Sequence, residues 1–114
     1  MDEKKLIQAC IAEDKTAQRF LYEQFSPKMY FLCLRYAKSE AEAQDILQDG
    51  FIKVFDKLSS FRFKGSFEGW IRRIMVNTAL NYIRKKSHQE EVIGLDDYQD
   101  QVVSSKAISK LSEQ

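Results

Sequence analysis

The chain has 114 residues, of which 44% are hydrophobic and 31% are charged, as is typical of one soluble domain with a single core. Only four glycines and one proline occur, which favours long helices over a β-fold rich in turns. No apolar run approaches the roughly 18 residues that mark a membrane span, and the N-terminus lacks the layout of a signal peptide. We therefore expect a cytoplasmic protein with no membrane insertion.

Apolar residues at helical spacing predict a first helix over residues 4–12 and a second that begins near Lys15, with Asp14 as its N-cap. Ser26 and Pro27 then either start a fresh helix or kink this one, because proline suits a first turn and disrupts a helix interior. Helix resumes over residues 28–37.

The clearest helix covers residues 39–58. Ser39 and Glu42 have the spacing of a capping box, and one apolar stripe follows, formed by Ala43, Ile46, Leu47, Gly50, Phe51, Val54, Phe55 and Leu58. Residues 59–65 break the pattern and predict a loop. A last helix is predicted from Ser66, as its cap, to Lys86. The fold class is therefore all-α, a small helical bundle with three to four main helices.

Periodicity fades after Ser87. Residues 88–104 are predicted to form an acidic, flexible linker, and residues 105–114 could begin another helix. The chain is therefore divided into a bundle domain, 1–87, and a following segment, 88–114.

Charge is distributed in blocks that the net charge of +1 conceals. Residues 39–58 carry five acids against two bases, and residues 88–100 carry five acids and no lysine or arginine. Residues 62–86 carry seven bases against one acid, a net charge of +6. Such a basic segment suits a polyanionic partner.

The residues that supply metal or nucleophile chemistry are sparse. Cys10 and Cys33 lie far apart without CxxC spacing, which predicts buried free thiols, and His88 is the only histidine. We expect no catalytic residues, no metal site and no cofactor, and an enzyme is the weakest of the functional hypotheses.

A helical wheel of residues 66–86 places a polar stripe beside the apolar face. Trp70, Arg73, Asn77, Asn81 and Arg84 fall within an arc of about 80° at roughly 100° per residue. Arginines neutralise phosphates, exposed aromatic rings stack on bases, and asparagines contact base edges. The aromatic share favours single-stranded over duplex nucleic acid, although rings at helical spacing are more often core.

Two runs resemble a known family, AQDILQDGFIKVF over residues 43–55 and FRFKGSFEGWIRRIMVNTALNYIR over residues 61–84. They are similar to region two of the extracytoplasmic-function sigma factors of bacterial RNA polymerase, and the stretch around Phe20 to Lys28 resembles the family's first helix pair. The resemblance covers residues 4–87. It implies a non-enzymatic domain that recognises and melts the promoter minus-ten element.

The resemblance also implies partners. The acidic helix would dock on a coiled coil in the β′ subunit of core RNA polymerase, through Asp45, Gln48, Asp49 and Lys53. Many family members also have an anti-sigma factor. The non-template single strand of promoter DNA would contact the loop and the last helix, through Phe61, Arg62, Phe63, Lys64, Ser66, Trp70, Arg73, Asn77, Asn81, Arg84 and Lys85.

The sequence departs from the family pattern at several positions. Phe63 and Lys64 stand where the family more often has a glycine and an acid, Asn81 stands where many members have aspartate, and Arg72 replaces a frequent aromatic residue. Family members carry a second, C-terminal helix-turn-helix domain. By this resemblance we expect residues 88–114 to be the acidic interdomain linker and the start of that domain, and the chain to be a truncated piece of a longer factor rather than a natural single-domain protein.

Two alternative functions stay open at this point. A helical domain that reads duplex grooves would show a short glycine-containing turn between two helices and a polar recognition helix. A helical bundle that sequesters another protein would explain the acidic helix but not the stripe of tryptophan, arginine and asparagine.

Overall fold

The computed structural model describes residues 2–100, with the side chains of residues 2–89. Its elements in chain order are α1 (Glu3–Ile11), α2 (Lys15–Leu34), α3 (Glu40–Lys57), the short 3-10 helix η1 (Leu58–Ser60) and α4 (Phe67–Asp100). The described residues contain no strand, so the all-helical prediction is confirmed. No helix in this part of the chain is long and apolar enough to cross a membrane.

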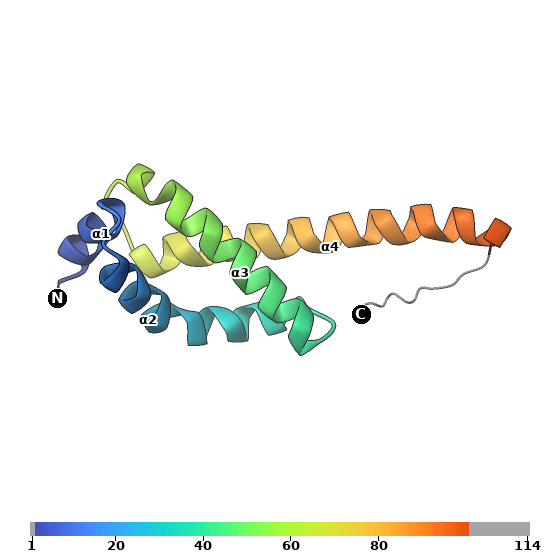
Figure 1. Cartoon of the computed structure of the whole chain (residues 1–114), viewed down its shortest axis with the longest axis horizontal. Coiled ribbons are helices and arrows are strands. Elements are labelled where there is room, and N and C mark those ends of the chain that lie inside the picture. Colours follow the sequence, from blue (N-terminus) through green and yellow to red (C-terminus); the bar gives the residue numbers. More distant parts are fainter. Residues whose placement is uncertain (1, 101–114) are drawn as a thin grey trace.

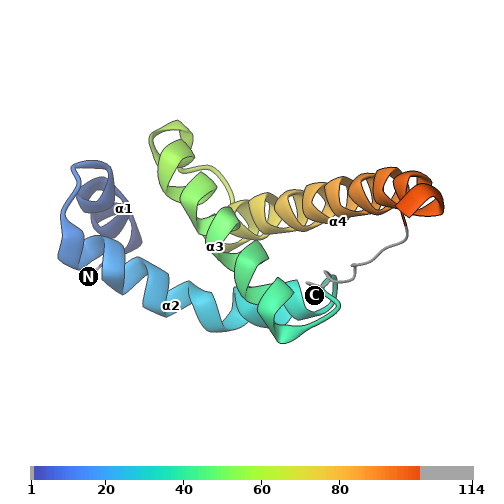
Figure 2. The same ribbon diagram turned by 45° about the vertical axis from the view of Figure 1, so that its right-hand side comes forward.

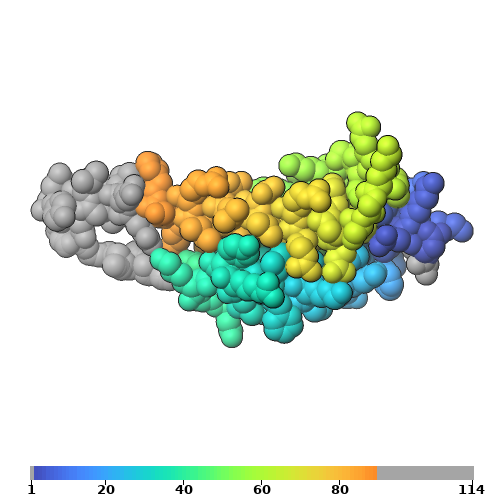
Figure 3. All heavy atoms as spheres, turned by 180° about the vertical axis from the view of Figure 1, so that it is seen from behind, coloured from blue at the N-terminus to red at the C-terminus, as the bar shows by residue number. Residues whose placement is uncertain are grey.

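The helices form one bundle around a single core. Figure 1 shows α2 and α3 diverging from the turn that joins them, with α1 near their open end and α4 crossed by α3. Figure 2 shows the same crossing from a second angle. Seen from behind in Figure 3, α2 lies along α4, and the segment that joins α3 to α4 stands out at one end beside α1.

Short polar side chains begin all four α-helices of the described residues, and Asp2 accepts from Lys5 N at 3.2 Å to cap α1. The Asp14 carboxylate accepts hydrogen bonds from the backbone N–H groups of Thr16 (3.0 Å) and Ala17 (3.2 Å). Ser39 Oγ accepts from Glu42 N at 3.1 Å, and Ser66 Oγ accepts from Gly69 N at 2.9 Å. These acceptors pair donors that a helix N-terminus leaves free, so the three predicted N-caps are confirmed.

The proline leaves α2 unbroken, which resolves the two possibilities at Ser26 and Pro27. The helix runs through Pro27 to Leu34, three residues short of the predicted end. Proline lacks the N–H that would bond the carbonyl four residues earlier. The ribbon of α2 changes direction along its length in Figure 2, as expected for a helix with an internal proline.

The predicted apolar stripe of α3 forms the centre of the core. Ala43, Ile46, Leu47, Phe51, Val54 and Leu58 are buried, and Phe55 is half-buried. They pack in one cluster with Ile7, Leu21, Phe25, Met29, Phe67, Ile71 and Met75 from the other helices. Where α3 crosses α4, Gly50 is buried against Met75, and a Cβ at residue 50 would collide with the thioether.

The predicted end of the last helix at Lys86 is wrong. Instead, α4 continues to Asp100, so the prediction of a flexible linker fails over residues 88–100. This stretch has one glycine and no proline to stop a helix. Figure 1 shows the C-terminal half of α4 extending past the other helices. The apolar pattern fades there because a helix segment without packing partners needs no apolar stripe. The predictions for residues 101–114 lie outside the described residues.

The contact between Gly50 and Met75 gives a stability prediction. We expect Gly50→Ala to lower the free energy of unfolding by about 1–2 kcal/mol, because overpacking against a buried side chain outweighs the gain in helix propensity. Gly69→Ala is the matched control, since its Cβ would lie 3.4 Å from Ser66 Cβ, an ordinary contact. Urea denaturation of both variants checks the prediction, and equal effects would contradict it.

Candidate functional site

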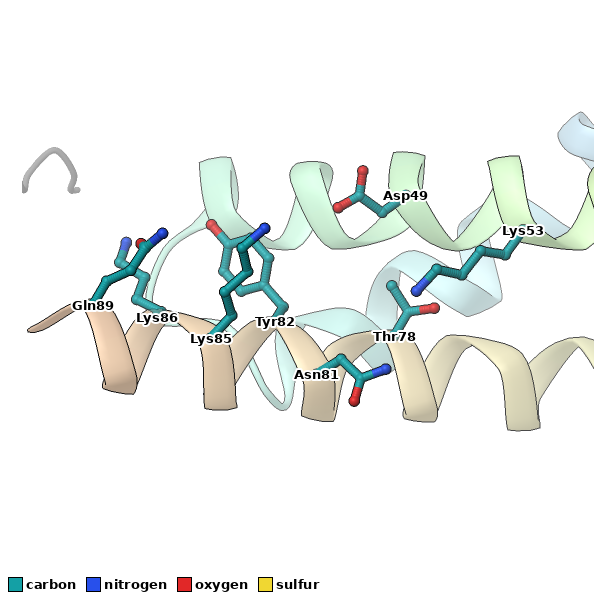
Figure 4. Close-up of a pocket in the computed structure, with 8 residues that line it drawn as sticks. All are labelled: Asp49, Lys53, Thr78, Asn81, Tyr82, Lys85, Lys86 and Gln89. Carbon is teal, nitrogen blue, oxygen red and sulfur yellow. The ribbon is translucent and has the colours of Figure 1, made fainter.

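A groove runs between α3 and α4 and is lined by polar side chains of both helices (Figure 4). One part has a volume of about 500 Å³ and is lined by Asp49, Lys53, Thr78, Asn81, Tyr82, Lys85, Lys86 and Gln89. An adjoining part of about 400 Å³ is lined by Lys53, Lys57, Ile74, Asn77, Thr78, Leu80, Asn81 and Arg84. Three shared residues make the two parts one continuous depression, which we call the α3–α4 groove.

The α3–α4 groove carries cations on both walls, and Asp49 of α3 is the acid among its lining residues. Lys53 and Lys57 contribute cations from α3, and Arg84, Lys85 and Lys86 contribute cations from α4. Figure 4 shows the Lys53 side chain reaching from α3 toward Thr78 on α4. Opposed cations on two helices create a positive potential along the groove, which attracts an anionic chain.

An ion pair fixes one end of the groove. Lys86 Nζ lies 2.8 Å from Glu42 Oε2, and Glu42 Oε1 accepts a hydrogen bond from Lys38 N at 2.9 Å. Ser39 therefore caps α3, but Glu42 bonds the N–H before the cap, so only half of the predicted capping box forms. Burial by itself would raise the pKa of Glu42, yet the bonds and charges of Lys86 and Lys38 lower it below its ordinary value.

Two hydroxyl groups lie within the groove. Thr78 is buried, and its hydroxyl donates to the Ile74 carbonyl at 2.7 Å. Tyr82 is half-buried, and its pKa is raised, first by burial and then by the charges of Glu42 and other acids of α3. Its hydroxyl therefore keeps its proton and is available as a hydrogen-bond donor.

The predicted polar stripe of α4 lies along the rim of this groove. Arg73, Asn77, Asn81 and Arg84 are exposed, while Trp70 is half-buried at the border of the core. Asn77, Asn81 and Arg84 line the groove itself, and Lys85 joins them. The structure thus brings together basic and amide groups, as the helical wheel predicted.

Aromatic rings support the loop over residues 61–66. Phe61 is 8% exposed and lies 5.3 Å from Trp70 and 5.1 Å from Phe67, measured between ring centroids. The rings of Phe67 and Trp70 are stacked at 5.8 Å. Phe61 was predicted to contact a ligand, but its ring is buried, so its place in the structure is that of a support beneath the loop.

Phe63 presents the accessible ring of this loop. Its side chain is 40% exposed, packs at 5.2 Å on Phe61 and lies under Lys4 Nζ, 5.6 Å from the ring centroid. Its φ of 61° is left-handed, which costs a non-glycine residue about 1–2 kcal/mol. A glycine would fit this position without strain, so Phe63 retains a strained backbone where its ring is exposed. Arg62, Lys64 and Ser66 are exposed beside it.

The outer face of α3 has a different chemistry. Asp45, Gln48 and Asp49 are exposed, and Ile52, at 59% exposure, lies on the same face. Lys53 was grouped with them from the sequence, but the structure places it in the α3–α4 groove, and Asp49 lines the groove as well, at the border of the outer face. An acidic face with an exposed aliphatic side chain suits a basic protein surface.

Several groove residues were missed from the sequence. They are the polar residues Lys57, Thr78, Tyr82, Lys86 and Gln89 and the apolar residues Ile74 and Leu80. The spacing of Lys53 and Lys57, four residues apart at the border of the apolar stripe, was a signal that both point to one side of α3. The others were not recognisable without knowing which face of α4 meets α3.

The two thiols are buried and free, as predicted. Burial raises the pKa of Cys33 to about 11, and burial with the Asp14 charge raises the pKa of Cys10. The described residues hold no cluster of three or more histidine, cysteine or acidic side chains that could bind a metal ion.

The ion pair between Glu42 and Lys86 makes stability depend on pH. Because folding lowers the pKa of Glu42 from 4.5, its carboxylate stabilises the fold above about pH 4.5, and this contribution is lost as the pH falls through the folded-state pKa. We expect Glu42→Gln to reduce the free energy of unfolding at pH 7 by about 1–2 kcal/mol and to reduce it by less at pH 3.

Denaturation of the native chain and of Glu42→Gln between pH 3 and pH 7 measures the difference between their free energies of unfolding. Glu40→Gln, which removes a charge from the same helical turn at an exposed position, is the control and should change stability by only about a few tenths of a kcal/mol. A constant deficit for Glu42→Gln across the whole pH range would contradict the prediction.

Comparison with known proteins identifies relatives of the chain. The family described as Sigma-70 region 2 matches residues 21–89. RNA polymerase sigma-H factor of Pseudomonas aeruginosa is 33% identical over 81 residues, which cover 71% of this chain and 42% of that protein. ECF RNA polymerase sigma factor SigW of Bacillus subtilis is 34% identical over 83 residues, covering 73% of this chain and 43% of that protein. The chain thus spans less than half the length of these relatives.

A solved structure has the same fold. An engineered region 2 of sigmaE, determined by NMR in complex with GTAAAA, superposes with a TM-score of 0.69 at 31% identity. The match covers 78% of this chain and 97% of that one. The family match spans more than half of the chain, and the fold agrees with it, so the chain belongs to the Sigma-70 region 2 family.

Proposed function

We propose that the chain is a sigma factor domain that binds core RNA polymerase and holds the non-template strand of the promoter minus-ten element in its melted form. The observation that carries the proposal is the separation of an acidic outer face on α3 from the basic α3–α4 groove and its adjoining aromatic loop. Two surfaces of opposite chemistry allow a polymerase and a DNA strand to be bound at the same time.

The polymerase contact is assigned to the outer face of α3. Asp45, Gln48 and Asp49 would face the basic coiled coil of the β′ subunit, and the exposed Ile52 adds an apolar contact at their centre. Charged groups arranged in this way speed association and fix the orientation of the partners. An anti-sigma factor that covered this face would block the same contact.

The DNA strand is assigned to the α3–α4 groove and the loop. Lys57, Arg84 and Lys85 would neutralise phosphates, and we assign Lys53 to this group because its side chain lies in the groove. Asn77 and Asn81 would contact base edges. The GTAAAA oligonucleotide bound by the engineered sigmaE domain supports a single-stranded ligand.

The loop is assigned to an unstacked base. Phe63 offers an exposed ring, while Phe61 and Phe67 hold Trp70 from beneath. Stacking of a base on an aromatic ring is worth about 1–3 kcal/mol, which offsets the cost of about a few kcal/mol for extruding it. Binding energy alone would keep the strand open, so the chain needs no catalytic step of its own.

Charge reversal on α3 tests the polymerase contact. We expect the Asp45→Lys, Gln48→Ala double variant to lose at least about tenfold in affinity for core RNA polymerase, because a cation would face the basic coiled coil. Retention of the tagged chain on immobilised core enzyme measures the loss. Glu23→Lys, at an exposed position on α2, is the matched control. Failure of the native, folded chain to bind core enzyme would refute this contact.

Removal of a groove lysine tests the DNA contact. We expect Lys57→Ala to weaken binding of a GTAAAA hexamer several-fold and to lower the dependence of log affinity on log salt by about 0.7 for one lost phosphate contact. Fluorescence anisotropy at several salt concentrations gives both values. Lys15→Ala, which removes the same charge at an exposed position on α2, should leave both unchanged. Equal effects of the two variants would place the DNA elsewhere.

A further inference from the structure

Arg84 contacts the groove asparagine that lies one turn before it on α4. Arg84 Nη1 donates a hydrogen bond to Asn81 Oδ1 at 3.1 Å. Asn81 lines both parts of the α3–α4 groove, whereas Arg84 lines only the part of about 400 Å³. In Figure 4 the amide oxygen of Asn81 points away from α3, and the amide nitrogen points toward Thr78.

The chemistry of arginine decides which way this amide faces. A guanidinium group has five N–H donors and no acceptor, so it can pair only with the oxygen of a side-chain amide. While the pair is formed, Asn81 therefore offers its NH₂ group to the groove. A free asparagine can turn its amide by half a turn and offer either the oxygen or the nitrogen.

The orientation of the amide restricts which base contacts Asn81 can make. The usual contact of asparagine with adenine is bidentate: the amide oxygen accepts from the N6 amino group, and the amide nitrogen donates to N7. With its oxygen held by Arg84, Asn81 keeps the donor half of this contact and lacks the acceptor half. It then binds an acceptor on a base edge without sensing the amino group of adenine.

We propose that Arg84 is a positioning residue that sets the base preference of Asn81 by holding its amide as a donor. The inference rests on the proposed function, since it needs a single strand in the groove. Only one N–H of Arg84 is engaged by Asn81, so the guanidinium group still has donors for a phosphate. Arg84 therefore acts on both affinity and specificity, and the two effects are separable by experiment.

Nucleobase analogues separate the effect of Arg84 on affinity from its effect on base specificity. The probe is a fluorescent GTAAAA hexamer in which each adenine in turn is replaced by purine, which lacks the N6 amino group but keeps N7. Anisotropy titrations of the 114-residue chain give the ratio of adenine affinity to purine affinity at each position. The variant is Arg84→Leu, an exposed substitution that preserves helix propensity, with its fold checked by circular dichroism.

We expect Arg84→Leu to raise the ratio of adenine to purine affinity at one position by about threefold to tenfold, the worth of one added hydrogen bond. The gain should disappear in the Arg84→Leu, Asn81→Ala double variant. Lys85→Leu is the control for loss of charge in the groove, and it should weaken all hexamers equally without changing any ratio.

Two results would count against the inference, and they differ from each other. If native chain and Arg84→Leu gave the same ratios at all four adenines, with only a uniform loss of affinity, Arg84 would be a phosphate contact and the positioning role would be overturned. If the native chain bound none of the hexamers, the proposed function itself would fail, and the inference would fall with it.

Discussion

The packing of α3 directly on α4 at Gly50 and Met75 determines the geometry of everything else in the molecule. Without a Cβ at residue 50, the backbone of α3 lies against the buried thioether of Met75. One turn further along each helix lie Lys53 and Thr78, which both line the α3–α4 groove. The separation of the two helices therefore sets the width of the groove, and side chains from both can contact one extended ligand.

The surface of α3 has three faces of different chemistry. The apolar face of α3 is buried in the core, the face with Asp45 and Gln48 is exposed, and the lysines at the border face α4. Asp45 and Gln48 thus lie on a different face of α3 from Lys57, while Asp49 lies at the border and also lines the groove. The ion pair of Glu42 with Lys86 joins the start of α3 to α4.

The loop over residues 61–66 combines rigidity with exposure. Phe61 is buried among Phe67 and Trp70, which anchors the loop to the core. Phe63 keeps its ring accessible, and its backbone is left-handed. Backbone strain of this kind persists only where the surroundings hold it, and it is frequent at binding sites. A rigid loop loses little conformational entropy when a base binds to it.

The sequence by itself determined the helices that pack, three of their four N-caps and the stripe on α4. Caps such as Asp14 and Ser39 depend on residues that are close in the sequence. A helix face that is buried needs apolar residues at helical spacing, and this spacing can be recognised in the sequence. The resemblance to sigma factors was also available from residues 43–55 and 61–84 alone, because the spacing of aromatic, amide and basic residues is specific.

Only the tertiary structure decided which residues meet across helices. The placement of Lys53 and Lys57 opposite Asn81, the burial of Phe61 and the pairing of Glu42 with Lys86 all depend on how α3 crosses α4. The extension of α4 to Asp100 was missed because this part of the helix extends past the other helices. Apolar periodicity reports packing rather than helicity, so a helix that continues beyond its packing partners leaves no such pattern in the sequence.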